Sequence, residues 1–139
     1  MKTIENREDV SLLVHSFYDK IRKHEILGPI FNGSIPDDHW PEHLEKLTDF
    51  WESNLFGIAK FRGNPPAAHQ RVDAKEGHTI SQTHFGHWLQ LWFETLDELF
   101  EGPRAELAKD RARRMSTGLF LAIWHSRPDE IKYANKSEE

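Results

Sequence analysis

Hydrophobic residues recur at helical spacing along most of the chain, and no stretch shows the alternation of a strand. The first stripe follows Asn6, a residue type that often caps a helix N-terminus, and it is broken at Gly28-Pro29. Its apolar members are Val10, Leu13, Val14, Phe17 and Ile21, with Tyr18 at the edge. This spacing predicts a first long helix that buries one face.

A second long stripe follows two aspartates, and we expect Asp37 or Asp38 to cap its helix and Gly57 to end it. Pro41 is tolerated in the first turn, where its missing N–H group is not needed. The apolar side of this helix consists of His43, Leu44, Leu47, Phe50, Trp51 and Leu55. One histidine, His43, is therefore predicted on a face that is otherwise apolar.

The stretch FRGNPPAAHQRV, residues 61 to 72, carries His69 in the longest region without a strong helical stripe. The fixed φ of Pro65-Pro66 suits the start of a short helix. We expect residues 73 to 80 to form a loop. A bundle of four helices does not need such an interruption, whereas a segment that presents a histidine to a prosthetic group would.

Two more long helices are predicted, the third capped by Ser81 and the fourth separated from it by Gly102-Pro103 and closed by Pro128. The third has apolar Phe85, Trp88, Leu89, Trp92, Phe93, Leu96, Leu99 and Phe100, and the fourth has Leu107, Ala108, Ala112, Met115, Leu119, Phe120 and Ile123. The fold class is therefore all-α. We expect one domain over residues 1–139, with a core of about 7–126 and a flexible polar tail at 127–139.

Composition narrows the functional classes. A chain of 139 residues suits one domain, and a net charge of −5 argues against a nucleic-acid partner. The chain has no Cys, which excludes disulfides, thiolate zinc sites and a Cys nucleophile and fits a reducing compartment. No stretch approaches the ~20 apolar residues of a membrane span, and no signal-peptide run is present. We expect a cytoplasmic protein without a membrane partner.

Most histidines receive no role at this stage, although nine are present. His39 and His43 are four apart and could share zinc, but no Glu follows His39 as in HExxH and no third ligand is evident, so zinc is not favoured. We expect His84 and His87 near a helix surface. We likewise assign nothing to His15, His24, His78 and His125. Phosphate loops, the G-x-S-x-G elbow and the dinucleotide glycine fingerprint are absent.

Two interpretations of the remaining polar residues stay open. A lone histidine such as His69 in a short helix is usually structural, and His43 alone reads as a partly buried histidine bonded to backbone. Tyr18 and Trp88 each carry one donor on a helix whose stripe faces the core, and a buried donor needs a partner. The partner is either water at the edge of the core or a ligand in a cavity.

Five segments, in order, resemble the truncated haemoglobins, and group III most closely. They are FYDKIRKHEILGPIFN at 17 to 32, WPEHLEKLTDFW at 40 to 51, FRGNPPAAHQRV at 61 to 72, HWLQLWFETLDELF at 87 to 100 and RARRMSTGLF at 111 to 120. The likeness runs from about residue 7 to residue 126. Phe31, where group II usually has tyrosine, and His43 both favour group III. Trp92 and the histidine-rich stretch at 84 to 87 are not explained by the family pattern.

The resemblance implies a two-over-two helical sandwich that encloses haem b, with His69 as the iron ligand. It places Tyr18, His43 and Trp88 on the distal side, where O2, NO or CO would bind a penta-coordinate iron. Lys46 occupies a position that can reach a haem propionate. The cofactor-binding residues implied in this way are Phe31, His43, Lys46, Leu47, Phe50, His69, Phe85 and Trp88.

The function expected from this resemblance is O2 and NO redox chemistry or sensing, not bulk O2 transport. NO dioxygenase or peroxidase-like activity would need a separate reductase, because the chain has no flavin or nicotinamide motif. The alternative is a cofactor-free helical interaction domain in which His69 and the aromatic residues only pack. The physiological ligand, the redox partner and any binding of His43 to iron remain open.

Overall fold

The computed structural model describes residues 1–133, and its elements are helices apart from one isolated bridge between Lys2 and Phe100. The helices are α1 (Arg7–Lys23), α2 (Leu27–Ser34), the 3-10 turn η1 (Asp37–His39), α3 (Trp40–Phe56), α4 (Pro65–Lys75), α5 (Gln82–Leu99), α6 (Pro103–Ser126) and α7 (Asp129–Lys132). The prediction of an all-α fold is confirmed.

Several predicted helix ends are confirmed by their local chemistry. The Asn6 side chain accepts the backbone N–H of Asp9 at 3.0 Å and so caps α1. Pro65-Pro66 begins α4, and Ser81 precedes α5. Gly57 ends α3 with a φ of 67°, a left-handed conformation that glycine adopts without the steric cost of a side chain.

Two predicted breaks are wrong in their details. Gly28-Pro29 does not merely end a pattern but lies in the first turn of α2, where proline needs no N–H donor. Gly28 is required there because an added Cβ would lie 2.6 Å from the Arg22 carbonyl oxygen. Asp37 and Asp38 do not cap α3. They form η1, and α3 begins after His39.

Two segments predicted as irregular are partly helical. α4 continues to Lys75, so the loop that we predicted from residue 73 begins three residues later than expected. Asp129–Lys132 forms the short helix α7 within the tail that we expected to be flexible. The last residues of that tail, 134–139, lie outside the described part of the chain.

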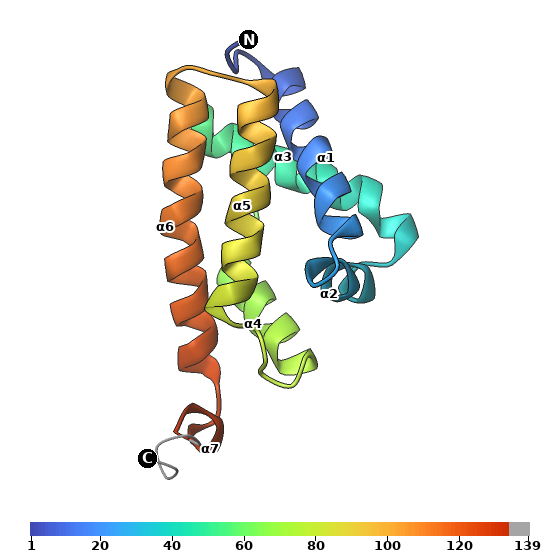
Figure 1. Cartoon of the computed structure of the whole chain (residues 1–139), viewed down its shortest axis with the longest axis vertical. Helices are drawn as coiled ribbons and strands as arrows, with labels where there is room; N and C mark the ends of the chain where they lie inside the picture. The colour runs from blue at the N-terminus through green and yellow to red at the C-terminus, as the bar shows by residue number, and fades with distance from the viewer. Residues whose placement is uncertain (134–139) are drawn as a thin grey trace.

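Two helix pairs make the body of the molecule, as Figure 1 shows: α1 packs against α3, and α5 runs beside α6. Contacts between α1 and α5 join the pairs, while α4 packs against α6 near the end of the body that is distant from the N-terminus. None of the helices within residues 1–133 has both the length and the apolar character to cross a bilayer.

The centre of the core is an aromatic stack on Trp92, the residue that the family pattern did not explain. Trp92 is fully buried and stacks on Trp51 at 4.4 Å and on Trp88 at 6.1 Å between ring centroids. Its indole N–H donates to the Ala108 carbonyl at 3.1 Å. Trp92 therefore ties α5 to both α3 and α6, and it supports Trp88 from behind.

Candidate functional site

A partly open cavity of about 460 Å³ is lined by residues of α1, α2, α3, α4, α5 and α6. Its volume falls in the range of roughly 300–1,000 Å³ that is usual for small-molecule and cofactor sites. Most of the wall is apolar. The larger apolar side chains in it are Phe31, Leu47, Phe50, Phe61, Phe85, Met115, Leu119 and Ile123. The structure therefore brings together Phe31 of α2, the pair Leu47 and Phe50 of α3, and Phe85 of α5, from three helices that lie far apart in the sequence.

His69 lies in the cavity wall with its ring held in one orientation. The Nδ1 atom is 2.7 Å from the Pro65 carbonyl oxygen, which can only accept, so Nδ1 carries the hydrogen and Nε2 keeps a free lone pair. Burial lowers the pKa of His69, and the bond to Pro65 opposes this shift. The ring is therefore neutral near pH 7. The acceptor of the His69 N–H, which the sequence did not identify, is the backbone carbonyl of Pro65, four residues earlier.

Tyr18 and Trp88 line the same cavity. Tyr18 is buried, and burial raises the pKa of its hydroxyl well above the ordinary value, while a hydrogen bond from the Trp88 indole opposes the rise. The phenol therefore stays protonated. Within residues 1–133 the Tyr18 proton has no protein acceptor. The cavity thus contains a buried O–H group that is available to a ligand.

His43 and Lys46 lie outside the cavity wall. The His43 ring is partly buried, with its centroid 6.3 Å from Tyr18 and 5.5 Å from Trp40. Burial, followed by the nearby Lys46 ammonium, lowers the pKa of His43, so this ring is also neutral near pH 7. Lys46 itself is exposed. His43 can therefore act on the cavity through Tyr18 or after a rotation of its own side chain.

Four polar residues of the wall were missed by the sequence analysis, and one of them is Ser34 of α2. Arg71 and Lys75 bring cations from α4, and the Lys75 ammonium reaches the Gly33 carbonyl of α2 at 2.5 Å. His84, which we expected near the surface without a role, also lines the cavity. Its i, i+4 spacing to Trp88 was the signal that could have placed both side chains on one helix face.

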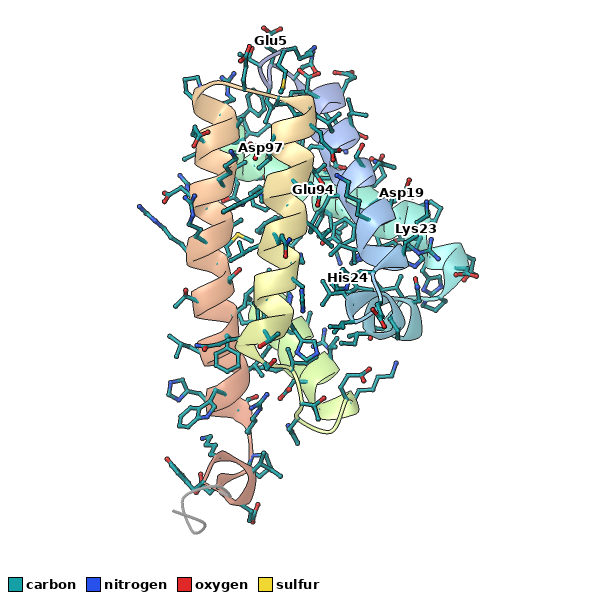
Figure 2. All side chains as sticks on the ribbon, viewed as in Figure 1. Glu5, Asp19, Lys23, His24, Glu94 and Asp97 are labelled. Atoms are coloured by element: carbon teal, nitrogen blue, oxygen red, sulfur yellow. The ribbon has the colours of Figure 1, made fainter. Side chains whose placement is uncertain are left out.

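Among the other histidines, His24 bonds backbone groups at the start of a helix. The His24 Nδ1 atom accepts the backbone N–H groups of Ile26 and Leu27 at the start of α2. Figure 2 shows His24 beside α5, where its ring lies 5.0 Å from that of His87. Across residues 1–133, no three His, Asp or Glu side chains gather to hold a metal ion.

Comparison with known proteins gives two matches, although no family model matches the chain. The group 3 truncated hemoglobin ctb from Campylobacter jejuni is 32% identical over 114 residues, which cover 81% of this chain and 86% of that protein. The crystal structure of a group III truncated hemoglobin from Campylobacter jejuni matches with a TM-score of 0.78 at 30% identity. That match covers 88% of this chain and 95% of the other. Sequence and fold similarity therefore extend over most of each chain.

Proposed function

The chain belongs to the truncated haemoglobin family and is most similar to group III, and from this premise we propose that it binds haem b and diatomic gases. The predicted truncated-globin fold is confirmed by the structural similarity. The observation that supports the proposed function best is His69, an oriented and neutral imidazole with a free Nε2 in the wall of an apolar cavity.

The cavity residues fit a flat, mostly apolar macrocycle with charged edges. Phe31, Leu47, Phe50 and Phe85 supply apolar contact surface. Arg71 and Lys75 in the wall are suited to pair with the carboxylates of such a ring, and the exposed Lys46 outside the wall is a third candidate for that contact. When bound, haem supplies the iron that binds gases and exchanges electrons, and the protein sets ligation and polarity.

The contribution of the chain on the proximal side is to hold His69. The Pro65 carbonyl fixes the tautomer and the rotation of the ring, which is how an outer hydrogen bond tunes a metal ligand. The missing N–H groups of Pro65 and Pro66 cost nothing at the first turn of α4. The helix therefore begins at Pro65, whose carbonyl is the acceptor for His69. We infer that His69 would hold the haem iron through Nε2, and that no second side chain of the protein would bind it.

On the distal side, the Tyr18 O–H is the hydrogen-bond donor that is available to a polar diatomic ligand, and the Trp88 indole N–H is a second donor once it leaves its bond to Tyr18. Two or three donors, with His43 as the third, would contribute roughly 0.5–1.5 kcal/mol each and slow O2 release by about one to three decades. CO is less polarised and gains less. Slow release is poorly suited to O2 carriage. It favours redox chemistry on the bound ligand, or sensing.

An enzyme and a sensor are distinguished by turnover. In NO dioxygenation, NO would consume bound O2 to give nitrate, and a separate reductase would have to restore the ferrous state. Stopped-flow mixing of the oxygenated protein with NO, followed by a reduction assay with a supplied reductant, separates the two. Fast nitrate formation with repeated turnover supports an enzyme, and reversible displacement of O2 by NO supports a sensor.

The test of haem binding is the absorption spectrum of the ferrous protein with and without CO. The wild type, expressed with ample porphyrin, should show a Soret band that shifts with CO. His69→Gly should lose this spectrum and regain it with free imidazole, whereas His125→Gly, a change at an exposed site, should leave it intact. A colourless wild type would instead support the cofactor-free interaction domain.

A further inference from the structure

The helix that carries His69 is joined to the rest of the molecule mainly through α6. α4 follows an irregular segment at residues 57–64, and its closest helix packing is against α6. The Gln70 side chain donates to the Ala122 carbonyl at 2.9 Å. One turn later, Arg127 donates to both carboxylate oxygens of Asp73, at 2.9 and 3.0 Å. The position of α4 therefore depends on a few polar contacts.

The contact between Asp73 and Arg127 is a buried, bidentate ion pair. The Asp73 side chain is fully buried, and that of Arg127 is 12% exposed. Asp73 also accepts the Ile80 N–H at 3.1 Å, and the His78 Nδ1 atom lies 3.2 Å from its second oxygen. A bidentate pair fixes geometry more tightly than a single bond, and its burial makes it costly to break.

The chain also reverses around Asp73. Gly77 and His78 both adopt positive φ, 72° and 61°, and the His78 N–H donates to the Asp73 carbonyl at 2.7 Å. A left-handed conformation is uncommon for a histidine and needs support from its surroundings. The end of α4, the turn after it and the end of α6 thus meet at one carboxylate. An ion pair that only added stability would not need to join these three segments.

Asp73 lies four residues after His69, so both side chains occur on the same face of α4. We propose that Asp73, Arg127 and Gln70 form a clamp that sets how far His69 reaches into the cavity. This inference rests on the proposed binding of haem by His69. The clamp residues are positioning residues: they act on the bond between Nε2 and iron by fixing the helix that carries the ring.

The experiment compares Asp73→Asn with Asp9→Asn in the haem-loaded protein. Asp9 is a matched control because it is a buried carboxylate that bonds Lys2 and the Glu5 N–H, and it does not line the cavity. Asp73→Asn should shift or broaden the iron–histidine stretching band in the resonance Raman spectrum of the ferrous form. It should also speed haem loss about five- to tenfold, whereas Asp9→Asn should change neither.

Gln70→Leu provides a second variant if Asp73→Asn fails to fold. It removes a neutral contact between α4 and α6 and leaves no buried charge, and it should change the same band in the same direction by less. If the folded clamp variants keep the iron–histidine stretching band and the haem-loss rate of the wild type, the proposal of a clamp is wrong. Failure of the proposed function would appear differently, as a wild type with no Soret band or no iron–histidine band.

Discussion

His69 and His84 lie in the same cavity wall, but their hydrogen bonds leave different atoms for a ligand. His69 uses Nδ1 to donate to a carbonyl, which leaves the Nε2 lone pair free. The Nδ1 of His84 accepts the backbone N–H of Ser81 at 3.0 Å, so its Nε2 carries hydrogen when the ring is neutral. His69 can therefore bind a metal, whereas His84 can only donate to a bound group.

Loss of the Tyr18 hydroxyl in Tyr18→Phe should raise the O2 dissociation rate roughly two- to tenfold, because the one hydrogen bond that it donates to O2 contributes about 0.5–1.5 kcal/mol. Phenylalanine preserves the packing against Phe17, whose ring centroid lies 4.8 Å away. Flash photolysis and ligand-replacement kinetics measure the O2 and CO rates. CO release should change little. Equal changes for both gases would contradict the hydrogen-bond account and point to altered packing.

The sequence predicted much of the wall because apolar helix stripes and cavity walls follow the same periodicity. It placed Tyr18 and Trp88 on stripes, and the structure gives both a place in the wall. It missed Arg71 and Lys75 because a cation on a short helix looks the same whether it borders water or a cavity. It could not choose between roles for His69 without the family resemblance, because the deciding contact is a backbone carbonyl.

At the scale of the elements, the sequence predicted which segments form the long helices, but it did not predict several of the residues at which they begin and end. Gly57 and Pro65-Pro66 mark ends because their φ values leave few alternatives. Asp37 looked like a cap, yet its side chain bonds Arg22 at 3.0 Å and the chain makes a 3-10 turn there instead. α4 extends to Lys75, and Asp73 in its last turn is the buried partner of Arg127. That contact spans 54 residues and has no local signal.

Two glycines give opposite predictions for the same change to alanine. Gly57→Ala should lower the free energy of unfolding by about 1–2 kcal/mol, because its φ of 67° is strained for a residue with a Cβ. Gly118→Ala should raise it by about 0.5–1 kcal/mol, because Gly118 lies inside α6 and the added carbon meets nothing within 4 Å beyond its chain neighbours and the backbone of its own helix. Urea unfolding measures both. Shifts of the same sign would contradict the conformational argument.

The clamp between α4 and α6 also predicts a pH dependence of stability. Burial alone would raise the pKa of Asp73, but Arg127, His78 and the Ile80 N–H together hold it below its ordinary value of 3.8. Its contribution is therefore complete above that value and is lost as pH falls through the folded-state pKa. Asp73→Asn should cost about 3–5 kcal/mol at pH 7 and less near pH 3, as measured by urea unfolding. A difference that does not change with pH would contradict this.

At the scale of the whole molecule, the fold combines a tightly packed half with a hollow one. Phe17, Trp51 and Trp92 fill the contact between the two helix pairs, and Phe17 meets Trp92 edge to face at 4.9 Å. The cavity lies beside this cluster and shares Trp88 with it. The aromatic cluster therefore forms a rigid base behind Tyr18 and Trp88 on one side of the cavity. On the other side, α4 with His69 packs mainly against α6 and is held by fewer contacts.

This asymmetry predicts where haem should stabilise the protein. Local stability follows buried apolar contacts, and a ligand that binds only the folded state adds to it. In hydrogen exchange, removal of haem should speed exchange most in residues 65–75 and least around Trp92, because α4 packs mainly against α6 and borders the cavity. Restoring haem should slow it again, and His69→Gly without imidazole should behave like the haem-free protein. Equal changes in α4 and in the Trp92 region would contradict the division into a rigid base and a helix held by the clamp.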